Sequence, residues 1–208
     1  MNKEYDVVIV GGGMVGAAVA CSLGDSALKV AVVEQLIPEQ FEADQAHDLR
    51  VSALSIASKN ILETVGAWNG VLNRRFCPFR RMRVWETAGD TEFNSDDLDY
   101  SELGFIVENR ITQLALLERL SEFENIELIA PARIKKINYA ADVSSGQTTL
   151  VLEGGDELQA KVLVAADGGN SRVRQAVGLG VTSWDYKQHA MVIYVETDYP
   201  QQDITWQR

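Results

Sequence analysis

Residues 5–34, YDVVIVGGGMVGAAVACSLGDSALKVAVVE, decide the fold. The run before the glycines is short, β-branched and continuously apolar, which predicts a buried parallel strand. Residues 14–23 are rich in alanine and other small apolar residues and lack proline, so we expect a helix that packs on a sheet. A second apolar run, residues 29–33, ends at Glu34. This order of strand, glycine turn, helix, second strand and acidic residue predicts a βαβ unit that binds a dinucleotide.

Each glycine of the GxGxxG turn has a physical role. Gly11 permits the tight turn after the strand, Gly13 lets a diphosphate approach the backbone, and Gly16 lets the helix lie close to the strands. The diphosphate would then bind the unpaired N–H groups at the helix N-terminus, where Met14 and Val15 lie. A glycine-rich turn without a ligand is the alternative that the motif alone leaves open.

The acid at the end of the second strand narrows the choice of nucleotide. Glu34 follows Gly16 by 18 residues, and a carboxylate there can accept hydrogen bonds from ribose hydroxyls. Its charge would repel a 2′-phosphate, so FAD or NAD is expected rather than NADP. Gln35, the next residue, is included among the candidate cofactor contacts.

Composition excludes several classes of protein. The chain has 208 residues, 46% of them hydrophobic and 24% charged, as in ordinary globular proteins of one large or two small domains. A net charge of −11 makes a nucleic-acid partner unexpected. The sequence contains neither a signal peptide pattern nor an apolar run of the ~20 residues that span a bilayer. Two cysteines make no disulfide framework, so we expect a cytoplasmic protein.

Two arginines are candidates for contact with the diphosphate. Arg50 precedes a stretch that we expect to be helical up to about residue 65, and Arg110 opens a predicted helix over residues 111–122. A guanidinium at such a position can donate forked hydrogen bonds to a phosphate. Spacing alone leaves a structural role open for both.

A second motif follows another buried strand. Residues 161–166 form a continuously apolar run, and DGGNSRVR follows at 167–174. Asp167 would lie at the carboxyl end of the strand, where open α/β sheets bind ligands. Ser171 can cap the next helix. A plain strand-to-helix turn is the alternative for this motif.

The remaining pattern predicts an α/β fold in two discontinuous parts. Residues 132–139 and 148–152 are expected to form an antiparallel ribbon, joined by a loop at 142–146. Alternating residues at 82–86 and 190–196 predict strands with one wet face, and the strand-like residues 204–208 have no evident partner, as if the chain were cut short. We therefore expect a Rossmann-like domain over 1–75 and 108–181, and part of a mainly antiparallel substrate domain over 76–107 and 182–208.

Taken together, the glycine turn, Glu34, RVSAL at 50–54, VENR at 107–110 and ADGGNSRVR at 166–174 resemble the flavoprotein aromatic hydroxylases of the p-hydroxybenzoate hydroxylase fold. Within that group they look most like the ubiquinone-biosynthesis hydroxylases of the 2-octaprenylphenol type. The resemblance covers essentially the whole chain.

The resemblance implies roles for individual residues. Gly11, Gly13 and Gly16 would hold the FAD diphosphate and Glu34 the adenosine ribose. Arg50 and Arg110 would contact the diphosphate side, whereas Val51 and Ser52 would lie toward the flavin ring. Asp167 would help to hold FAD and serve the reduced pyridine nucleotide.

The resemblance also implies a reaction and partners. NAD(P)H and O₂ would be used to hydroxylate a polyprenylated phenol in ubiquinone biosynthesis. The partners that the resemblance implies are a ubiquinone-biosynthesis complex and further copies of the chain, and the implied location is peripheral, at the inner face of the membrane. We name no catalytic acid or base, because the cofactor carries this chemistry, and we identify no metal site.

One departure from the family pattern matters. The family has a second flavin motif, a Gly-Asp segment with a following proline and glycines, and none follows Asp167. We therefore expect this 208-residue chain to bind FAD weakly or not at all and to lack hydroxylase activity.

Two other functional classes remain open from the sequence. One is another FAD- or NAD-dependent oxidoreductase; an NAD-dependent dehydrogenase would need catalytic His or Lys–Tyr machinery, yet the chain has two histidines, His47 and His189, neither in a catalytic pattern. The other is a non-catalytic nucleotide-fold scaffold in a biosynthetic complex.

Overall fold

The chain divides into two compact units. In a computed structural model that describes residues 2–140 and 146–208, the first unit comprises residues 1–40 and 116–188 and the second comprises 41–115 and 189–208. Residues 142–145 of the predicted loop lie outside the described residues. Each unit is described by itself below.

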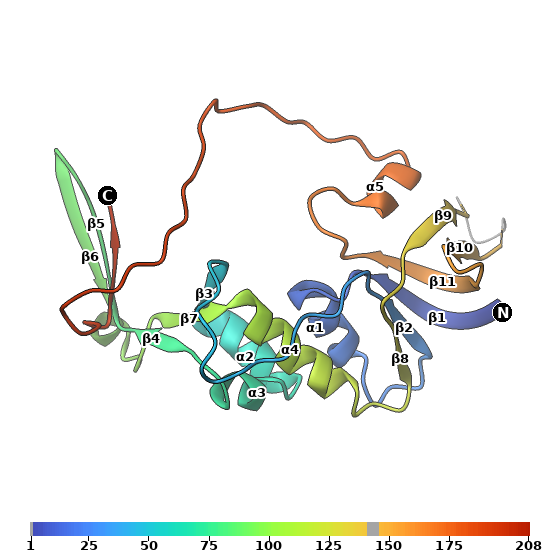
Figure 1. The fold of residues 1–208 in the computed structure, drawn as a ribbon, viewed down its shortest axis with the longest axis horizontal. Coiled ribbons are helices and arrows are strands. Elements are labelled where there is room, and N and C mark those ends of the chain that lie inside the picture. Colours follow the sequence, from blue (N-terminus) through green and yellow to red (C-terminus); the bar gives the residue numbers. More distant parts are fainter. Residues whose placement is uncertain (1, 141–145) are drawn as a thin grey trace. The chain divides into compact units, whose positions relative to one another are not determined.

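The first unit is built on a six-stranded sheet among the described residues (Figure 1). Four parallel strands come first, in the order β8 (Ile126–Ile129), β2 (Val30–Val33), β1 (Asn2–Val10) and β11 (Glu157–Ala165). The antiparallel strands β10 (Thr148–Leu152) and β9 (Ile134–Asn138) extend this sheet beyond β11. The predicted parallel sheet with an antiparallel ribbon is therefore confirmed.

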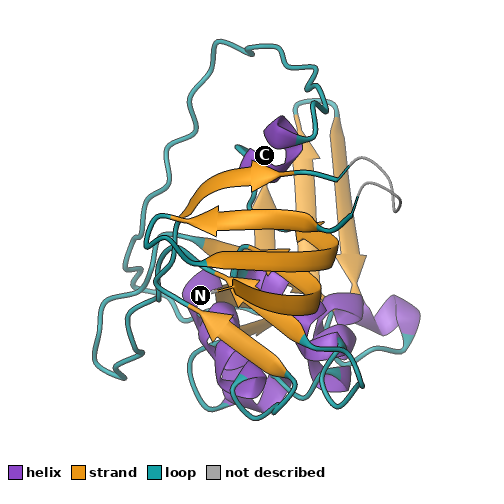
Figure 2. Ribbon diagram, turned by 90° about the vertical axis from the view of Figure 1, so that its right-hand side faces the viewer, coloured by secondary structure: helices purple, strands orange, loops and turns teal. Residues whose placement is uncertain are grey.

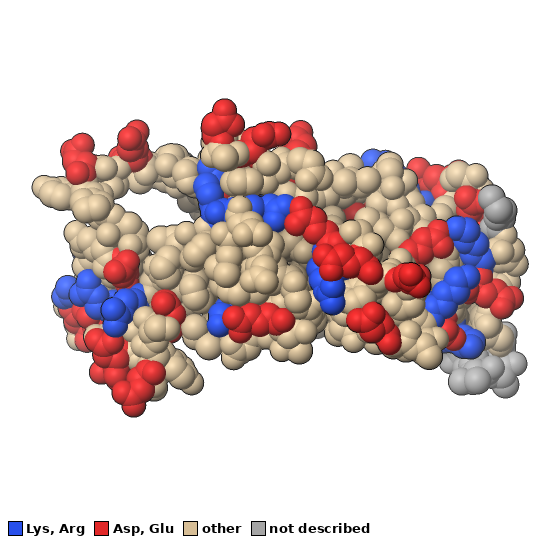
Figure 3. Space-filling view, turned by 90° about the horizontal axis from the view of Figure 1, so that it is seen from below, with Lys and Arg blue, Asp and Glu red and all other residues tan. Residues whose placement is uncertain are grey.

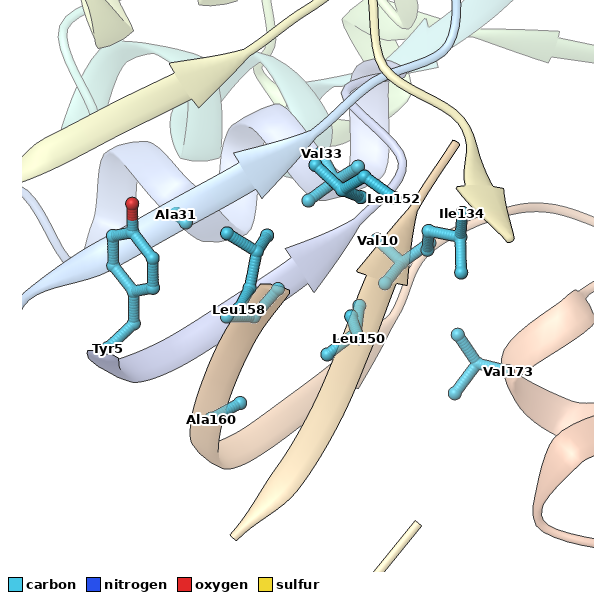
Figure 4. Close-up of a cluster of buried hydrophobic side chains, with 11 residues drawn as sticks. Tyr5, Val10, Ala31, Val33, Ile134, Leu150, Leu152, Leu158, Ala160 and Val173 are labelled. Atoms are coloured by element: carbon cyan, nitrogen blue, oxygen red, sulfur yellow. The ribbon is translucent and has the colours of Figure 1, made fainter. Parts of the chain in front are cut away.

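The apolar runs form strands because both faces of the sheet are covered. Val8, Val10, Ala31 and Val33 belong to one buried cluster, which continues onto β9, β10, β11 and the short helix α5 (Arg172–Ala176) through Val173 (Figure 4). The alternate residues of β1 and β2 point to the other face. There the helix α1 (Met14–Ser22) packs on both strands. A strand that is covered on both faces needs apolar residues at successive positions, and this is why the continuous apolar runs predicted these strands.

Helix α4 (Asn109–Leu120) contributes to the cores of both units, since the division falls within it. Its three predicted core leucines are buried, at 114, 117 and 120. Cys21 on α1 is also buried, its thiol 3.4 Å from the carbonyl oxygen of Leu116. Burial raises the pKa of the Cys21 thiol to about 11, so this cysteine behaves as a small apolar residue.

The second unit contains two small sheets, whose strands Figure 2 draws in orange. One sheet joins β3 (Val51–Ser55), β7 (Gly104–Glu108) and β4 (Cys77–Phe79) in antiparallel order. The other contains the hairpin of β5 (Arg81–Glu86) and β6 (Gly89–Asn94), with β12 (Ile204–Gln207) parallel to β5. The remaining elements are the helices α2 (Ile56–Thr64) and α3 (Trp68–Leu72) and the 3₁₀-helix η1 (Ser95–Leu98).

The structure corrects two strand predictions near the end of the chain. Residues 190–196 form no strand, and Met191 is 86% exposed within the long segment between α5 and β12 (Figure 1). An alternating sequence makes a strand only where another strand takes its hydrogen bonds. Residues 204–207, by contrast, do have a partner, because β12 pairs with β5.

The unit boundaries differ from the expected domain boundaries. Residues 41–75 and 108–115 group with the second unit rather than the first. The physical reason is pairing, since β3 hydrogen-bonds to β7 and α2 packs on α3 and β3. The expected domain over residues 1–75 followed the order of the sequence, which does not show that residues 51–55 pair with β7.

The charged surface is mixed in sign. Acidic and basic side chains alternate over the face shown in Figure 3. In the arginine-rich segment 74–83, Arg80 pairs with Asp96 at 2.7 Å and Arg83 pairs with Asp90. These exposed arginines therefore carry their own counter-ions.

Candidate dinucleotide-binding site

The glycine turn has the backbone geometry that its sequence predicts. Gly11 follows β1 with φ +102°, a conformation that favours glycine, and its N–H donates to the carbonyl oxygen of Val33 at 2.9 Å. A Cβ at Gly11 would lie 2.4 Å from the carbonyl oxygen of Ala166. Gly11 thus lets β1, β2 and β11 converge at one edge of the sheet.

The other two glycines differ in what surrounds them. A Cβ at Gly16 would lie 1.8 Å from the carbonyl oxygen of Gly11, so this position needs glycine for close packing of α1. A Cβ at Gly13 would meet no heavy atom within 4 Å of the described structure. A diphosphate can therefore approach the backbone at Gly13, because no described atom covers this position.

The first turn of α1 supplies donors. Gly13 is the N-cap residue, Met14 and Val15 follow it, and Val15 is 69% exposed. The first N–H groups of a helix have no acceptor within the helix, and the helix dipole adds partial positive charge. This nine-residue helix therefore presents an anion-binding end beside the open glycine.

Glu34 is fixed by two backbone hydrogen bonds. Its Oε2 accepts from the Gly12 N–H at 2.6 Å and its Oε1 accepts from the Leu36 N–H at 2.8 Å. The carboxylate is half-buried at the carboxyl end of β2, and Gln35 beside it is exposed. Each carboxylate oxygen retains a further lone pair that can accept from a hydroxyl group.

Asp167 is held in the same way at the end of β11. Its Oδ2 accepts from the N–H groups of Arg172 at 2.7 Å and Val173 at 3.2 Å. Its Oδ1 is buried and has no hydrogen-bond partner within the described residues. Ser171 caps α5, as predicted, through the Arg174 N–H at 3.0 Å. One buried acceptor of Asp167 is therefore left for a ligand.

These groups surround one cavity of about 480 Å³ within the first unit. Five of the predicted residues line it: Gly11, Gly13, Glu34, Gln35 and Asp167. Met14, Val15 and Gly16 lie in the first turn of α1 next to it in sequence. The cavity lies at the carboxyl ends of parallel strands, where α/β sheets bind nucleotides.

The cavity also has lining residues that were not among the candidate cofactor contacts. They come from the segment between β8 and β9, the start of β9, the turn after β11 and the start of α5: Ala132, Arg133, Ile134, Asn170 and Arg172. No local pattern marks residues 132–134, because they reach the cavity through a backbone contact with the end of β2. That contact is the hydrogen bond from the Ala132 N–H to the carbonyl oxygen of Glu34 at 2.8 Å.

The other predicted site residues belong to the second unit. Arg50 does not open a helix, because Val51 begins strand β3; its carbonyl oxygen accepts from the Asn109 N–H at 2.9 Å. Val51 is 49% exposed, and the Ser52 hydroxyl donates to Oδ1 of Asn109 at 2.6 Å. Residues 51–55 pair with β7 as a strand, and the helical stretch predicted up to about residue 65 follows them as α2.

Arg110 does lie at a helix start, in the first turn of α4, and it pairs with a carboxylate there. Its Nε is 2.9 Å from Oδ2 of Asp48. Two residues earlier, the buried Glu108 accepts from Nε of Arg75 at 3.0 Å and from the Asp48 N–H at 2.9 Å. We call Asp48, Arg75, Glu108 and Arg110 the carboxylate–arginine network.

This network includes two residues whose importance the sequence did not show. Arg75 also donates to the carbonyl oxygens of Gln45 at 2.8 Å and Ala46 at 3.2 Å, and so fixes the preceding loop. Arg75 belongs to no motif, and Glu108 lies in the VENR segment at 107–110, where the resemblance implied a role for Arg110 alone. A carboxylate ending an apolar strand, at FIVE over residues 105–108, is the one signal that could have indicated it.

The fold and the cavity define a class of protein, the α/β domains that hold a dinucleotide at the carboxyl edge of a parallel sheet. The family model of the FAD binding domain matches residues 4–207, so the chain belongs to this family. FAD, the cofactor predicted from the sequence, is the cofactor of that family. This family match and the similar proteins described below confirm the resemblance to flavoprotein hydroxylases.

The chain is 37% identical over 208 residues to the 3-demethoxyubiquinol 3-hydroxylase of Escherichia coli K12, covering all of this chain and 52% of that protein. It is 36% identical over 222 residues to the human ubiquinone biosynthesis monooxygenase COQ6, covering 47% of it. The crystal structure of Pseudomonas aeruginosa PqsL in complex with 2-aminobenzoylacetate has a similar fold, with a TM-score of 0.69 at 25% identity over 88% of this chain and 48% of that one. The chain thus spans about half the length of these proteins.

FAD fits the residues that are present. The open side at Gly13 leaves room for a diphosphate, and the α1 N-terminus supplies N–H donors for it. The buried Oδ1 of Asp167 can accept a hydrogen bond from the cofactor. Within the described residues there is no group of three or more metal-ligating side chains, and no helix there has the length and apolarity to cross a bilayer.

Proposed function

We propose that this chain is part of an FAD-dependent monooxygenase that hydroxylates a polyprenylated phenol ring in ubiquinone biosynthesis. The observation that carries the proposal is the meeting of Gly11, Gly13, Glu34 and Asp167 around one cavity. The names of the two ubiquinone-biosynthesis relatives, both matched over the whole of this chain, support the choice of substrate class.

The residues of the first unit bind and orient the cofactor in this proposal. The N–H groups at the start of α1 hold the diphosphate, Glu34 accepts from the adenosine ribose, and Oδ1 of Asp167 accepts from a hydroxyl or amide of FAD. When bound, FAD supplies the redox chemistry, with NAD(P)H as electron donor and O₂ as oxygen source.

Four further predicted residues have proposed roles in holding FAD. Arg50 and Arg110 serve the diphosphate side, while Val51 and Ser52 line the flavin side. The support is local order: the hydrogen bonds of Arg50 and Ser52 to Asn109, and of Arg110 to Asp48, hold this segment in one conformation. Such preorganisation is what positioning of a flavin ring requires.

The proposal extends to domains and partners. Residues 76–107 and 182–208 contribute to a substrate domain, and 1–75 with 108–181 to the FAD-binding domain. A polyprenyl chain is membrane-soluble, so we propose that the protein acts at the inner face of the membrane, as a homo-oligomer or within a ubiquinone-biosynthesis complex. Cosedimentation of the full-length protein with anionic vesicles checks the membrane contact.

The test is oxidation of NADH or NADPH by the purified full-length protein in the presence of a polyprenylphenol. We expect visible flavin absorbance and a product heavier by one oxygen atom in mass spectrometry. Gly13→Ala should abolish both, because its methyl group fills the diphosphate approach. Gly89→Ala makes the same change at an equally open position in the β5–β6 hairpin and should change neither.

Other outcomes would overturn the proposal. Reduction of NAD by a colourless protein would indicate a dehydrogenase, and partner binding without any redox activity would indicate a scaffold. For the 208-residue chain alone we propose weak FAD binding and no hydroxylation. A purified chain that is yellow with stoichiometric flavin would contradict that part.

A further inference from the structure

The segment between β8 and β9 brings an arginine to the nucleotide cavity. The Ala132 N–H is bonded to the carbonyl oxygen of Glu34 at 2.8 Å, and the carbonyl oxygen of Arg133 accepts from the Glu153 N–H at 2.9 Å. The backbone of residues 132–133 is therefore held on both sides. This fixes Arg133 in the lining of the cavity, one residue beyond the contact with Glu34.

Two arginines line this cavity, and they differ in their partners. Arg172 donates to the carbonyl oxygens of Ile134 and Lys135, so its guanidinium is engaged by the protein. The guanidinium of Arg133 makes no hydrogen bond or ion pair within the part of the chain that the structure describes. Arg133 therefore has all five of its donors and both faces of its planar group available to a ligand.

An apolar side chain shares the same lining. Leu36 is 66% exposed, and its N–H is fixed by Oε1 of Glu34 at 2.8 Å. An exposed leucine beside a polar nucleotide site gains from being covered by a flat ring. Leu36 and Arg133 thus lie on two segments that are each hydrogen-bonded to Glu34, the residue expected to hold the ribose.

We propose that Arg133 and Leu36 hold the adenine ring of the cofactor, with the guanidinium stacked on the ring. This inference rests on the proposed function, in which the diphosphate lies at Gly13 and the ribose at Glu34. In ADP and in FAD the adenine is attached to the ribose on the side away from the diphosphate. The lining residues beyond Glu34 therefore meet the adenine, and a planar cation and an apolar side chain are suited to its faces.

The experiment is calorimetric titration of the 208-residue chain with ADP and, separately, with pyrophosphate. ADP carries adenine, ribose and diphosphate without flavin, so its binding tests the nucleotide part of the site without the flavin part. Arg133→Ala should weaken ADP binding about fivefold or more and leave pyrophosphate binding unchanged. Leu36→Ser should act in the same direction, and Lys136→Ala, an exposed cation on β9 outside the cavity lining, should change neither affinity.

Each other result has a defined meaning. If the unmodified chain binds neither ADP nor pyrophosphate, the proposed nucleotide site fails and this inference fails with it. If the chain binds ADP and Arg133→Ala binds it equally well, the inference alone is overturned. An equal loss of ADP and pyrophosphate, or full rescue by Arg133→Lys, would show that Arg133 acts on phosphate charge and would also overturn it.

Discussion

Two regions of this chain, one in each unit, use charged groups in opposite ways. In the first unit, Glu34 and Asp167 are anchored by backbone N–H groups, and the lining they share with Arg133 still offers an unpaired acceptor and an unpaired cation within the described residues. In the second unit, Glu108 and Asp48 are paired with Arg75 and Arg110. The first arrangement is suited to a ligand, and the second stabilises the fold.

The difference teaches how to separate site residues from structural ones. Both regions contain acid and arginine near a strand end, so residue type does not distinguish them. What distinguishes the carboxylates of the two regions is whether a side-chain partner pairs with them or the backbone alone holds them. Backbone anchoring leaves side-chain atoms for a ligand, whereas a side-chain pair uses them up.

The largest expected effect is that of Gly16→Ala in the first unit. Its methyl group would lie 1.8 Å from the carbonyl oxygen of Gly11, so α1 must move, and we expect a loss of about 3 kcal/mol or more in unfolding free energy. Gly13→Ala is the matched control, because it meets no atom within 4 Å. Urea denaturation should show wild-type stability for Gly13→Ala, and equal stability of the two variants would contradict the packing argument.

The next largest effect is expected in the carboxylate–arginine network of the second unit. Glu108→Gln leaves the partly buried Arg75 without its carboxylate, which should cost about 2–3 kcal/mol in unfolding free energy. ADP affinity should be unchanged, since Glu108 does not line the cavity and has no proposed contact with the ligand. Glu92→Gln, on an exposed strand beside Arg81 at 3.9 Å, is the control and should cost little. A loss of ADP binding in Glu108→Gln would break the comparison.

Asp167→Asn should weaken cofactor binding and leave the unfolding free energy nearly unchanged, which is the opposite of the result expected for Glu108→Gln. The remaining amide oxygen can still accept from the N–H groups of Arg172 and Val173, so we expect a change of less than about 1 kcal/mol in stability. The amide nitrogen would replace the buried acceptor in the cavity, and FAD affinity of the full-length protein should fall about tenfold. Flavin fluorescence measures this affinity, and an unchanged value would show that Oδ1 does not face the cofactor.

The smallest effect concerns the opposite edge of the same sheet. The ion pair with Lys3 and the hydrogen bond from Tyr5 hold the pKa of Glu127 below its ordinary value. A lowered pKa in the folded state contributes stability above about pH 4.5 that is lost as the pH falls through the lowered pKa.

Glu127→Gln should therefore flatten the acid limb of the stability curve, by less than about 1 kcal/mol because the pair is exposed. Urea unfolding at about pH 5 and about pH 3 measures this difference. Glu124→Gln, three residues earlier and exposed, is the control. A Glu127→Gln variant with the unmodified pH dependence would mean that the pair contributes nothing to folding.

Most of the first unit could be predicted because its signals are local. A continuous apolar run, a glycine turn and a capping serine each lie within ten residues, and the strands, α1 and the cap at Ser171 followed from them. Residues 51–55 and 190–196 could not be predicted. Their conformation depends on whether a distant strand accepts their hydrogen bonds, and one segment has that partner while the other lacks one within the described residues.

The sequence by itself determined the βαβ unit, the positions of the glycines and the acid, and the family, because these depend on short-range sterics and periodicity. Tertiary structure alone decided which arginines line the cavity and which pair with carboxylates elsewhere. Arg110 meets Asp48 across 62 residues, and residues 132–134 reach the end of β2 through one backbone hydrogen bond. Such contacts depend on the path of the whole chain, and no local pattern encodes that path.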